Sequence, residues 1–466
     1  MTRPNILFIS TDQQRWDALG ASGNPRIKTP NLDALAAGGV YFDCCIAQNP
    51  VCMPSRISTL SGRYCSALRI TQMAVTVPEE TVTLPRILGR YGYHNALIGK
   101  LHFTPHSNRD HRVPHPDYGF HHMELADEPG CYEDAYRAWV SKVAPDQLAH
   151  ISPGLPPAAR QWRRVMGISD HIEHPDRLDR GWNAFGGASD VTFSAFVGRQ
   201  TIEYLKNRRP DPFLCCAGFY SPHSPWIAPQ EFLDLYDPAD MRLPDFPPDL
   251  AQNRPNEAFS DRAIRENTRA YYAMVSEVDH WVGRILETLE EEGLADNTIV
   301  VFTSDHGEFM GEHLRYGKGP WAPDVVSRVP LIMRVPEALG GCSGRTVGDI
   351  VECVDIVPTL LDAAGIPVPP DVQGDMLPVT ERRPQCAGDG LGLTEWHGGR
   401  SLRLPGLRYV AMADGSEMLF DLKNDPWEYR NVADDPEYAD ALCGARKALI
   451  GRMIRIEQPL AREWPY

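Results

Sequence analysis

Apolar residues along the chain gather in short continuous runs rather than in an alternating pattern. The clearest runs are NILFIS (5–10), NALIG (95–99), FLCCAGFY (213–220), TIVVFTS (298–304) and VPLIMRV (329–335). Continuous apolar strands are buried on both faces, which is typical of a mainly parallel sheet covered by helices on each side. The pattern therefore predicts an α/β fold around one large sheet.

Helical spacing dominates one long stretch between two of these runs. From Thr268 to Gly293, apolar residues recur at intervals of three and four, and a glycine closes the stretch. Further on, the segments GLRYVAM (406–412) and EMLFDL (417–422) lie between turn-forming residues, and residues 435–454 have a helical pattern. We expect a long helix before the strand at 298–304, and a small antiparallel sheet with one helix near the C-terminus.

These patterns divide the chain into two predicted units. Residues 1–375 are expected to form a catalytic α/β domain, and residues 376–466 a smaller C-terminal α+β subdomain. Within the first unit, residues 104–190 are rich in His, Pro and Asp and have weak periodicity. We interpret this range as an insertion over the rim of the active site, because long irregular segments often shape binding pockets.

Composition and charge exclude several functional classes. The 466 residues are 42% hydrophobic and 23% charged, which are ordinary globular values, and the net charge of −16 argues against a nucleic-acid partner. No apolar stretch approaches the roughly 18 residues of a membrane helix, and the first run is too short for a signal peptide. We therefore expect a cytoplasmic protein without a membrane partner. The 11 scattered cysteines lack C-x-x-C spacing and predict neither a disulfide framework nor structural zinc.

Polar residues follow four of the apolar runs, where the carboxyl ends of parallel strands meet at one edge of the sheet. These clusters are Thr11-Asp12-Gln13, Lys100-Leu101-His102, Ser221-Pro222-His223 and Ser304-Asp305-His306. Ligands of open α/β sheets bind at this edge. A single strand-end aspartate is more often a helix cap or turn residue, but four clusters at one edge favour a binding site.

Four of these residues form a candidate metal site. Asp12, Gln13, Asp305 and His306 offer carboxylate, amide and imidazole donors. This donor set suits one hard divalent cation, Ca²⁺ first, with Mg²⁺ and Mn²⁺ as alternatives; the imidazole also leaves Zn²⁺ open.

Cys52 lies two residues before Pro54, which can occupy the first position of a helix, and four residues before Arg56. The positive end of that helix and the arginine would stabilise a thiolate or an anionic adduct. A cysteine-dependent phosphatase is one interpretation. However, its phosphate cradle requires a longer spacing than the three residues that separate Cys52 from Arg56 here.

The segment CMPSRISTLSGR (52–63) resembles the type I sulfatase signature, C-x-P-S-R-x-x-x-L-x-G-R, without a gap. Further segments that resemble the same family are YGYHNALIGKLHF (91–103), FLCCAGFYSPHSPW (213–226), TIVVFTSDHGEFMGEH (298–313), CVDIVPTLLDAAGIP (353–367) and MLFDLKNDPWEYRNVA (418–433). The chain is thus similar to the alkaline-phosphatase-like sulfatases over nearly its whole length. The resemblance implies that family's large mainly parallel sheet between helices, with a smaller C-terminal antiparallel sheet and a helix.

The resemblance also implies cofactors and residue roles. Cys52 would be oxidised to formylglycine by a formylglycine-generating enzyme, for which the neighbouring Pro, Ser and Arg are partly a recognition tag. The implied metal ligands are Asp12, Gln13, Cys52, Asp305 and His306. The implied catalytic residues are Cys52, Arg56, Lys100, His102, His223 and Lys318.

In the implied mechanism, the hydrated aldehyde is the nucleophile and Asp305 takes its proton. The metal and the three cationic side chains Arg56, Lys100 and Lys318 would neutralise the sulfuryl oxygens. His223, assisted by Lys318, would protonate the leaving oxygen. His102 would then deprotonate the remaining hydroxyl and release sulfate.

Two departures from the usual family pattern indicate a branch. Gln13 and His306 stand where most members carry Asp and Asn, as in the choline-sulfatases and phosphonate monoester hydrolases, and Lys318 also resembles those branches. Lys100 and His102 are the sulfatase-like choice. We expect hydrolysis of small anionic aryl or alkyl sulfate monoesters. A phosphonate monoester or phosphodiester hydrolase is the alternative. A thiol-dependent phosphatase and a non-catalytic binding protein are two further functional interpretations. A homo-oligomer is also compatible with the sequence.

Overall fold

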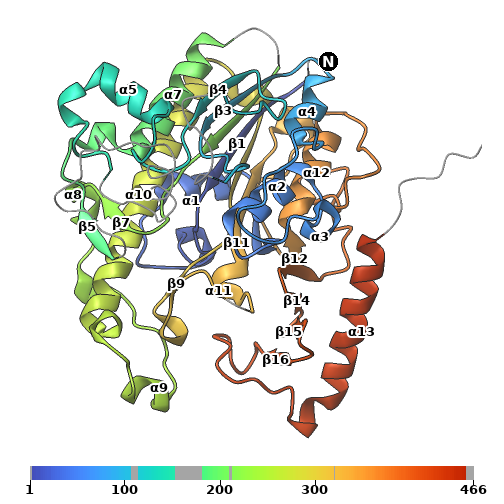
Figure 1. Ribbon diagram of the computed structural model, residues 1–466. Coiled ribbons are helices and arrows are strands. Elements are labelled where there is room, and N and C mark those ends of the chain that lie inside the picture. Colours follow the sequence, from blue (N-terminus) through green and yellow to red (C-terminus); the bar gives the residue numbers. More distant parts are fainter. Residues whose placement is uncertain (1–2, 106–113, 153–180, 209–211, 320, 458–466) are drawn as a thin grey trace, which may run out of the picture.

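A computed structural model describes residues 3–105, 114–152, 181–208, 212–319 and 321–457. An eight-stranded sheet forms its centre (Figure 1). Its strands in spatial order are β12 (Arg345–Glu352), β2 (Val40–Ile46), β11 (Arg328–Arg334), β8 (Thr298–Ser304), β1 (Asn5–Thr11), β6 (Phe213–Gly218), β3 (His94–Gly99) and β4 (His122–Leu125).

The predicted mainly parallel sheet is confirmed, and all five apolar runs form strands in it. One strand runs the other way, because β11 pairs antiparallel with both β2 and β8. An apolar run reports burial on both faces but not direction. The strands β2, β4 and β12 were not identified from apolar runs, since Asp43 interrupts β2 and the other two are polar edge strands.

Helices cover both faces of the sheet (Figure 1). Side chains along β1 alternate between two cores, with Ile6 and Phe8 in one and Leu7 and Ile9 in the other. The first core lies under α2 (Cys52–Ser61), α4 (Leu84–Gly89) and α12 (Ile356–Ala363). The second lies under α1 (Pro30–Ala37), α5 (Ala135–Val143), α7 (Phe193–Asn207) and α10 (Asp261–Glu291).

The long predicted helix is α10, and it starts seven residues earlier than its apolar pattern. Its first turn is polar, so periodicity alone does not mark it. Ser260 caps that turn, because its side chain accepts a hydrogen bond from the backbone N–H of Ala263. Among the described residues, no helix is both long and apolar enough to cross a bilayer. The compartment stays a prediction.

Shorter elements lie between these strands and helices along the chain. They are α3 (Cys65–Leu68), β5 (Trp182–Ala184), β7 (Trp226–Ala228), α8 (Gln230–Leu233), α9 (Pro248–Gln252), β9 (Phe309–Met310), β10 (Tyr316–Gly317) and α11 (Asp324–Ser327). In the range 104–190, β4 joins the central sheet and α5 covers it. Residues 106–113 and 153–180 of the expected insertion lie outside the described residues, so its position over the rim stays a prediction.

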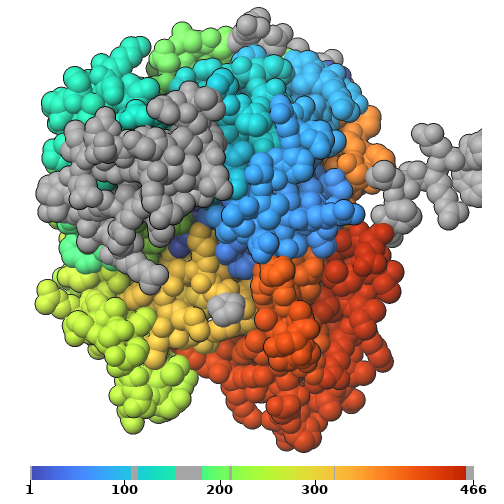
Figure 2. Space-filling model, in the orientation of Figure 1, coloured from blue at the N-terminus to red at the C-terminus, as the bar shows by residue number. Residues whose placement is uncertain are grey.

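The predicted C-terminal antiparallel sheet is confirmed. It consists of β13 (Gly392–Trp396), β14 (Gly399–Leu404), β15 (Leu407–Met412) and β16 (Glu417–Asp421), followed by α13 (Ala439–Ile456). The helix starts later than expected, because residues 436–438 form a separate short turn that Asp435 caps. Figure 2 shows this C-terminal part in red, packed against the orange and blue segments. The boundary at residue 375 remains a prediction.

A buried ion pair connects α13 to the large sheet. Glu352, at the end of β12, accepts hydrogen bonds from Arg452 of α13 and from the hydroxyl of Tyr64. Its other oxygen accepts from the backbone N–H of Leu393. All three side chains are nearly inaccessible to solvent. The C-terminal helix is therefore held by a charge that is buried with its partners rather than by apolar packing alone.

Candidate active site

Loops at the carboxyl ends of four strands, together with the start of α2, converge on one point. Asp12 follows β1, Lys100 follows β3, and His223 lies five residues after β6. Asp305 and His306 follow β8, and Cys52 is the first residue of α2. The parallel arrangement of β1, β3, β6 and β8 brings these sequence-distant segments to one edge, as expected for an open α/β sheet.

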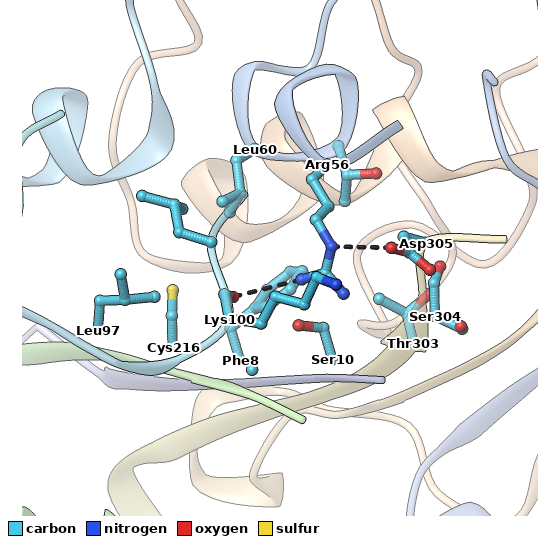
Figure 3. A pocket seen from close by; sticks show the side chains of 13 residues that line it. Phe8, Ser10, Arg56, Leu60, Leu97, Lys100, Cys216, Thr303, Ser304 and Asp305 are labelled. Atoms are coloured by element: carbon cyan, nitrogen blue, oxygen red, sulfur yellow. Dashed lines mark hydrogen bonds and ion pairs between the residues drawn. The ribbon is translucent and has the colours of Figure 1, made fainter. Parts of the chain in front are cut away.

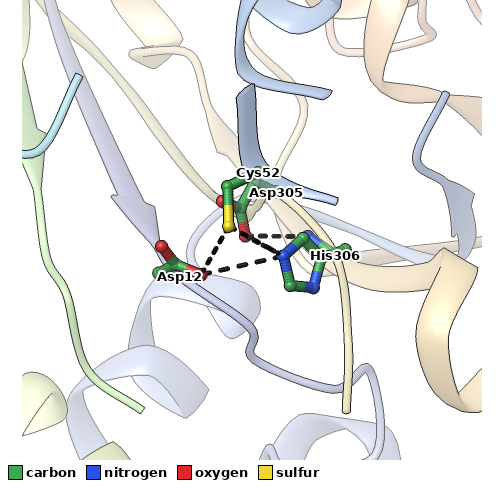
Figure 4. A group of neighbouring side chains, drawn as sticks. All are labelled: Asp12, Cys52, Asp305 and His306. Carbon is green, nitrogen blue, oxygen red and sulfur yellow. Dashed lines mark hydrogen bonds and ion pairs between the residues drawn. The ribbon is translucent and has the colours of Figure 1, made fainter. Parts of the chain in front are cut away.

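Four side chains of this group could hold a metal ion (Figure 4). The potential ligand atoms of Asp12, Cys52, Asp305 and His306 all lie within 4.8 Å of one another, and all four residues are buried. Cys52 Sγ is 3.3 Å from His306 Nε2 and 3.6 Å from Asp12 Oδ1. Carboxylate oxygens and an imidazole nitrogen gathered this closely are donors that a divalent cation can accept.

The imidazole of His306 has a defined orientation. Its Nδ1 lies 2.8 Å from the backbone oxygen of Gly307, and a carbonyl oxygen can only accept, so Nδ1 carries the hydrogen. Nε2 therefore turns its lone pair toward Asp12 and Cys52. Metal-binding histidines are commonly fixed in this way by a hydrogen bond from their other nitrogen.

Gln13 completes the candidate metal site. Its backbone has a left-handed φ of 71°, and its N–H donates to Asp305 Oδ1 at 3.0 Å. The side-chain Oε1 is buried, and within the described part of the chain no donor pairs with it. An unpaired buried amide oxygen beside two carboxylates suits a hard divalent cation, so the residues present fit the predicted metal.

Three cationic side chains surround the same point. Lys100 Nζ lies 2.6 Å from Asp12 Oδ2, and an Arg56 nitrogen lies 3.6 Å from the same oxygen. Burial alone would raise the pKa of Asp12, but the positive charges of Lys100, Arg56 and Lys318 hold it well below its usual value. The site thus keeps an ionised carboxylate at its centre and has positive charge for an anionic ligand.

Arg56 is fixed by several hydrogen bonds (Figure 3). Its Nε donates to Asp305 Oδ2 at 2.8 Å, and a terminal nitrogen donates to the backbone oxygen of Lys100 at 3.3 Å. The cavity of about 30 Å³ beside it is lined by apolar groups such as Phe8 and Leu97. This space can hold water but not a substrate. We therefore assign it to the packing around Arg56 and not to substrate binding.

Other residues of the 52–63 signature have structural roles. Ser55 is buried and donates to the backbone oxygen of Asp305 at 2.5 Å. Gly62 ends α2 with φ 67°, and a Cβ there would lie 2.9 Å from Val372. Pro54 is the third residue of α2 rather than its first, still within the turn whose N–H groups have no helical acceptor.

The thiol of Cys52 does not behave as the sequence suggests. Lys318 Nζ lies 2.7 Å from its sulfur, and the helix start adds positive potential. Burial nevertheless raises the pKa of Cys52, and the carboxylate of Asp12 raises it by more than Lys318 lowers it. The resulting pKa is about 11. The expectation of a stabilised thiolate is therefore wrong for the protein's own side chains, because burial outweighs the nearby cations.

His223 contacts Lys318, whose ammonium group also lies beside the sulfur of Cys52. Its Nδ1 lies 2.6 Å from the backbone oxygen of Ser224 and 2.9 Å from the hydroxyl of Tyr220. Lys318 Nζ lies 3.3 Å from its Nε2. Burial first, and then the charge of Lys318, hold the pKa of His223 well below its usual value. Burial would lower the pKa of Lys318, but Cys52 and Asp12 raise it above its usual value.

His102 lies two residues after Lys100, in a left-handed conformation with φ 58°. Asp127 Oδ1 accepts the backbone N–H groups of both Leu101 and His102, which fixes this turn. His102 is buried at the same edge of the sheet. The backbone turn that carries His102 therefore lies beside the site.

Sequence reasoning missed three residues that support the site: Tyr220, Asp127 and Glu308. Tyr220 donates to the Ser224 oxygen, contacts His223, and has Lys100 Nζ 4.8 Å from its ring centre. Tyr220 and Glu308 lie within segments 213–226 and 298–313, which resemble the sulfatase family, and each is close in sequence to a predicted site residue. That closeness was the signal that could have found them. No comparable signal exists for Asp127, which β4 brings to the site.

Comparisons with known proteins point to one family. The sequence profile of the sulfatase family matches residues 4–366. An arylsulfatase of Clostridium perfringens is 30% identical over 478 residues, covering 96% of this chain and 94% of that protein. A choline-sulfatase of Rhizobium meliloti is 26% identical over 93% of this chain and 83% of that protein.

Solved structures agree as well. The phosphonate monoester hydrolase of Agrobacterium radiobacter superposes with a TM-score of 0.81 at 27% identity, covering 97% of this chain and 96% of that one. The fold and the expected resemblance are thereby confirmed. The family profile spans most of the chain and includes all the strand-end clusters, so the chain belongs to the sulfatase family.

Proposed function

We propose that this member of the sulfatase family hydrolyses sulfate monoesters of small aryl or alkyl alcohols. The observation that carries the proposal is the position of Cys52, which belongs to the buried candidate metal site and whose sulfur lies 2.7 Å from the ammonium group of Lys318. A sulfate monoester is an anion that repels nucleophiles and has a poor leaving group. Concentrated positive charge addresses the first problem, and a proton donor addresses the second.

The nucleophile would come from formylglycine, formed from Cys52 by a formylglycine-generating enzyme. The raised pKa of the unmodified Cys52 supports this step, because a neutral thiol is a poor nucleophile. The hydrated aldehyde would supply the hydroxyl nucleophile for sulfur. A divalent cation held by Asp12, Gln13, Asp305, His306 and the residue at position 52 would neutralise the sulfuryl oxygens and make that hydroxyl more acidic.

The side chains of the protein would then move protons. Asp305 is the base that accepts the proton of the attacking hydroxyl, and Arg56 orients it through the hydrogen bond at 2.8 Å. Lys318 donates toward Nε2 of His223, so this pair protonates the departing ester oxygen. His102 would remove the proton of the remaining hydroxyl and allow sulfate to leave. Lys100, 2.6 Å from Asp12, would hold a sulfuryl oxygen.

The alternative activity is hydrolysis of phosphonate monoesters or phosphodiesters on the same scaffold. Gln13 and His306, with a solved phosphonate monoester hydrolase among the structural relatives, favour this possibility. These substrates carry one negative charge, as a sulfate monoester does, so some activity toward both is expected on physical grounds. A homo-oligomer also remains a prediction.

Two measurements test the proposal. The first is mass spectrometry of the tryptic peptide of residues 29–56, where formylglycine makes the peptide about 18 Da lighter than the cysteine form. The second is kcat/KM for matched nitrophenyl sulfate, phenylphosphonate and phosphodiester substrates, before and after removal of metal with EDTA. The proposal is supported if kcat/KM is highest for the sulfate and if this activity is lost with EDTA and restored by Ca²⁺ or Mn²⁺. A preference for the phosphonate or diester selects the alternative.

A further inference from the structure

Glu308 is a fully buried carboxylate that the proposed chemistry does not use. It lies two residues after His306, and both of its oxygens accept hydrogen bonds. The side-chain Nε2 of Gln13 donates to Oε2, and the backbone N–H of Gly317 donates to Oε1. Glu308 therefore connects a candidate metal ligand to the loop that carries Lys318.

The orientation of the Gln13 amide depends on this contact. A glutamine amide has nearly the same shape in its two orientations, but only one of them presents oxygen rather than an NH₂ group to a given partner. In the structure Nε2 of Gln13 donates to Oε2 of Glu308, so the NH₂ group of Gln13 faces that carboxyl group. The opposite atom, Oε1, is then the buried unpaired oxygen of the candidate metal site. A cation needs that oxygen, because an NH₂ group would point its hydrogens at the metal.

The second contact fixes Glu308 itself. Gly317 has a left-handed φ of 85° and pairs with Phe309 between β9 and β10, so its N–H is held by the backbone and cannot turn away. One oxygen of Glu308 is thus committed to a rigid donor, and the other is left for Gln13. The neighbouring acidic residue Glu312 makes a different set of contacts, with Arg15 at 2.8 Å and the backbone N–H of Met310 at 2.7 Å.

We propose that Glu308 is a positioning residue, which sets the Gln13 amide so that Oε1 faces the divalent cation. The inference rests on the proposed metal site and adds a polarity requirement to it: the residue at position 308 must be an acceptor wherever position 13 carries an amide.

The test exchanges the hydrogen-bond donor and acceptor between positions 13 and 308. In Glu308→Gln, the introduced carbonyl oxygen accepts from the fixed N–H of Gly317, and the introduced NH₂ group then faces the NH₂ group of Gln13. Gln13 relieves this conflict by turning its amide over, which presents an NH₂ group to the cation. We expect Ca²⁺ affinity, measured by calorimetry on EDTA-treated protein, to fall about tenfold or more, the cost of one mismatched hydrogen bond.

The double variant Gln13→Glu/Glu308→Gln should reverse this loss. The introduced carboxylate at position 13 accepts from the introduced amide at position 308 and still offers an oxygen to the cation. The charge of the pair is unchanged, and Ca²⁺ affinity should return to the wild-type value or exceed it. Because the introduced carboxylate also strengthens cation binding through its charge, the rescue is measured against Gln13→Glu alone, in which two carboxylates face each other. The double variant should bind Ca²⁺ more tightly than that single variant, whereas a merely structural role of Glu308 would give no such gain.

Glu312→Gln is the matched control, because it alters a similarly buried carboxylate nearby without touching Gln13. Its Ca²⁺ affinity should equal that of the wild type. Circular dichroism and Tm without metal establish that each variant is folded, and the rise of Tm on adding Ca²⁺ gives a second measure of binding. Folded Glu308→Gln protein with unchanged affinity, or a double variant no better than the single one, overturns the inference. Wild-type protein that binds neither Ca²⁺ nor Mn²⁺ overturns both the inference and the metal-site proposal.

Discussion

Nζ of Lys318 lies 3.3 Å from Nε2 of His223. Because Nδ1 of His223 donates to the backbone oxygen of Ser224, Nε2 is the acceptor and Lys318 the donor. The same ammonium lies 2.7 Å from the sulfur of Cys52. The ammonium group of Lys318 thus contacts both His223 and the proposed nucleophile, and its hydrogen bond to Nε2 supplies the proton that we propose for the leaving oxygen.

Removal of the lysine charge should change the titration of His223. Lys318 is one of the charges that lower the pKa of His223, so Lys318→Met is expected to move that pKa upward, although burial still keeps it below 6.5. The measurement is an NMR titration of the imidazole. His280 is an internal control, since the charges that act on it come from Arg284, Glu231 and Glu287 instead. An unchanged His223 pKa would contradict the proposed proton pair.

Replacement of His223 should affect substrates unequally. For His223→Ala we expect kcat/KM to fall about 100-fold or more with alkyl sulfates, which need a proton on the leaving oxygen, and far less with nitrophenyl sulfate. Tyr220→Phe is the control, because it removes one partner of Nδ1 and keeps the Ser224 oxygen. Equal losses across the leaving-group series would remove His223 from the acid role.

Cys52→Ala should abolish turnover and preserve the fold. The side chain is small and buried, and the proposed nucleophile is lost with it. We expect a decrease in kcat of at least about 1,000-fold, with near-native circular dichroism. Cys443→Ala is the control, since this cysteine is exposed on α13 and should have no effect. Retained activity in Cys52→Ala would rule out the nucleophile assignment.

Glu277 should make stability depend on pH. It is buried beside Thr192, and burial raises its pKa from 4.5 to about 7. Between these values the unfolded chain releases the proton and the folded chain keeps it, so this contribution is present below pH 4.5 and is lost as pH rises through about 7. Relative to Glu277→Gln, the wild type should lose about 3 kcal/mol of unfolding free energy across this window. Denaturant unfolding at several pH values measures the difference, and a variant of an exposed glutamate on the same helix, Glu290→Gln, should follow the wild type.

Arg452→Met should destabilise the protein, because it leaves Glu352 buried without its ion-pair partner. The expected loss is about 3–5 kcal/mol in urea unfolding, and the double variant with Glu352→Gln should recover part of it. Arg446→Met is the control on the same helix. Its pair with Glu417 is largely exposed, so the loss there should be much smaller than for Arg452→Met. Similar losses in both variants would mean that burial does not decide the effect.

Local sequence was sufficient for much of the fold. The apolar runs became β1, β3, β6, β8 and β11 because continuous burial leaves few alternatives to a central strand. The strand-end clusters were found for the same reason, since parallel strands place their carboxyl ends at one edge. The direction of β11 was not available from its residues, because direction is set by pairing with β2 and β8.

The sequence by itself determined the family, the sheet and the chemical groups that meet at its edge, because these depend on residue types and on spacings along the chain. Only the tertiary structure decided how those groups are tuned. Burial makes Cys52 a neutral thiol, Asp127 and Tyr220 hold the turns of His102 and His223, and Glu308 faces Gln13. Such effects arise from desolvation and from contacts between residues far apart in sequence, and neither leaves a local pattern.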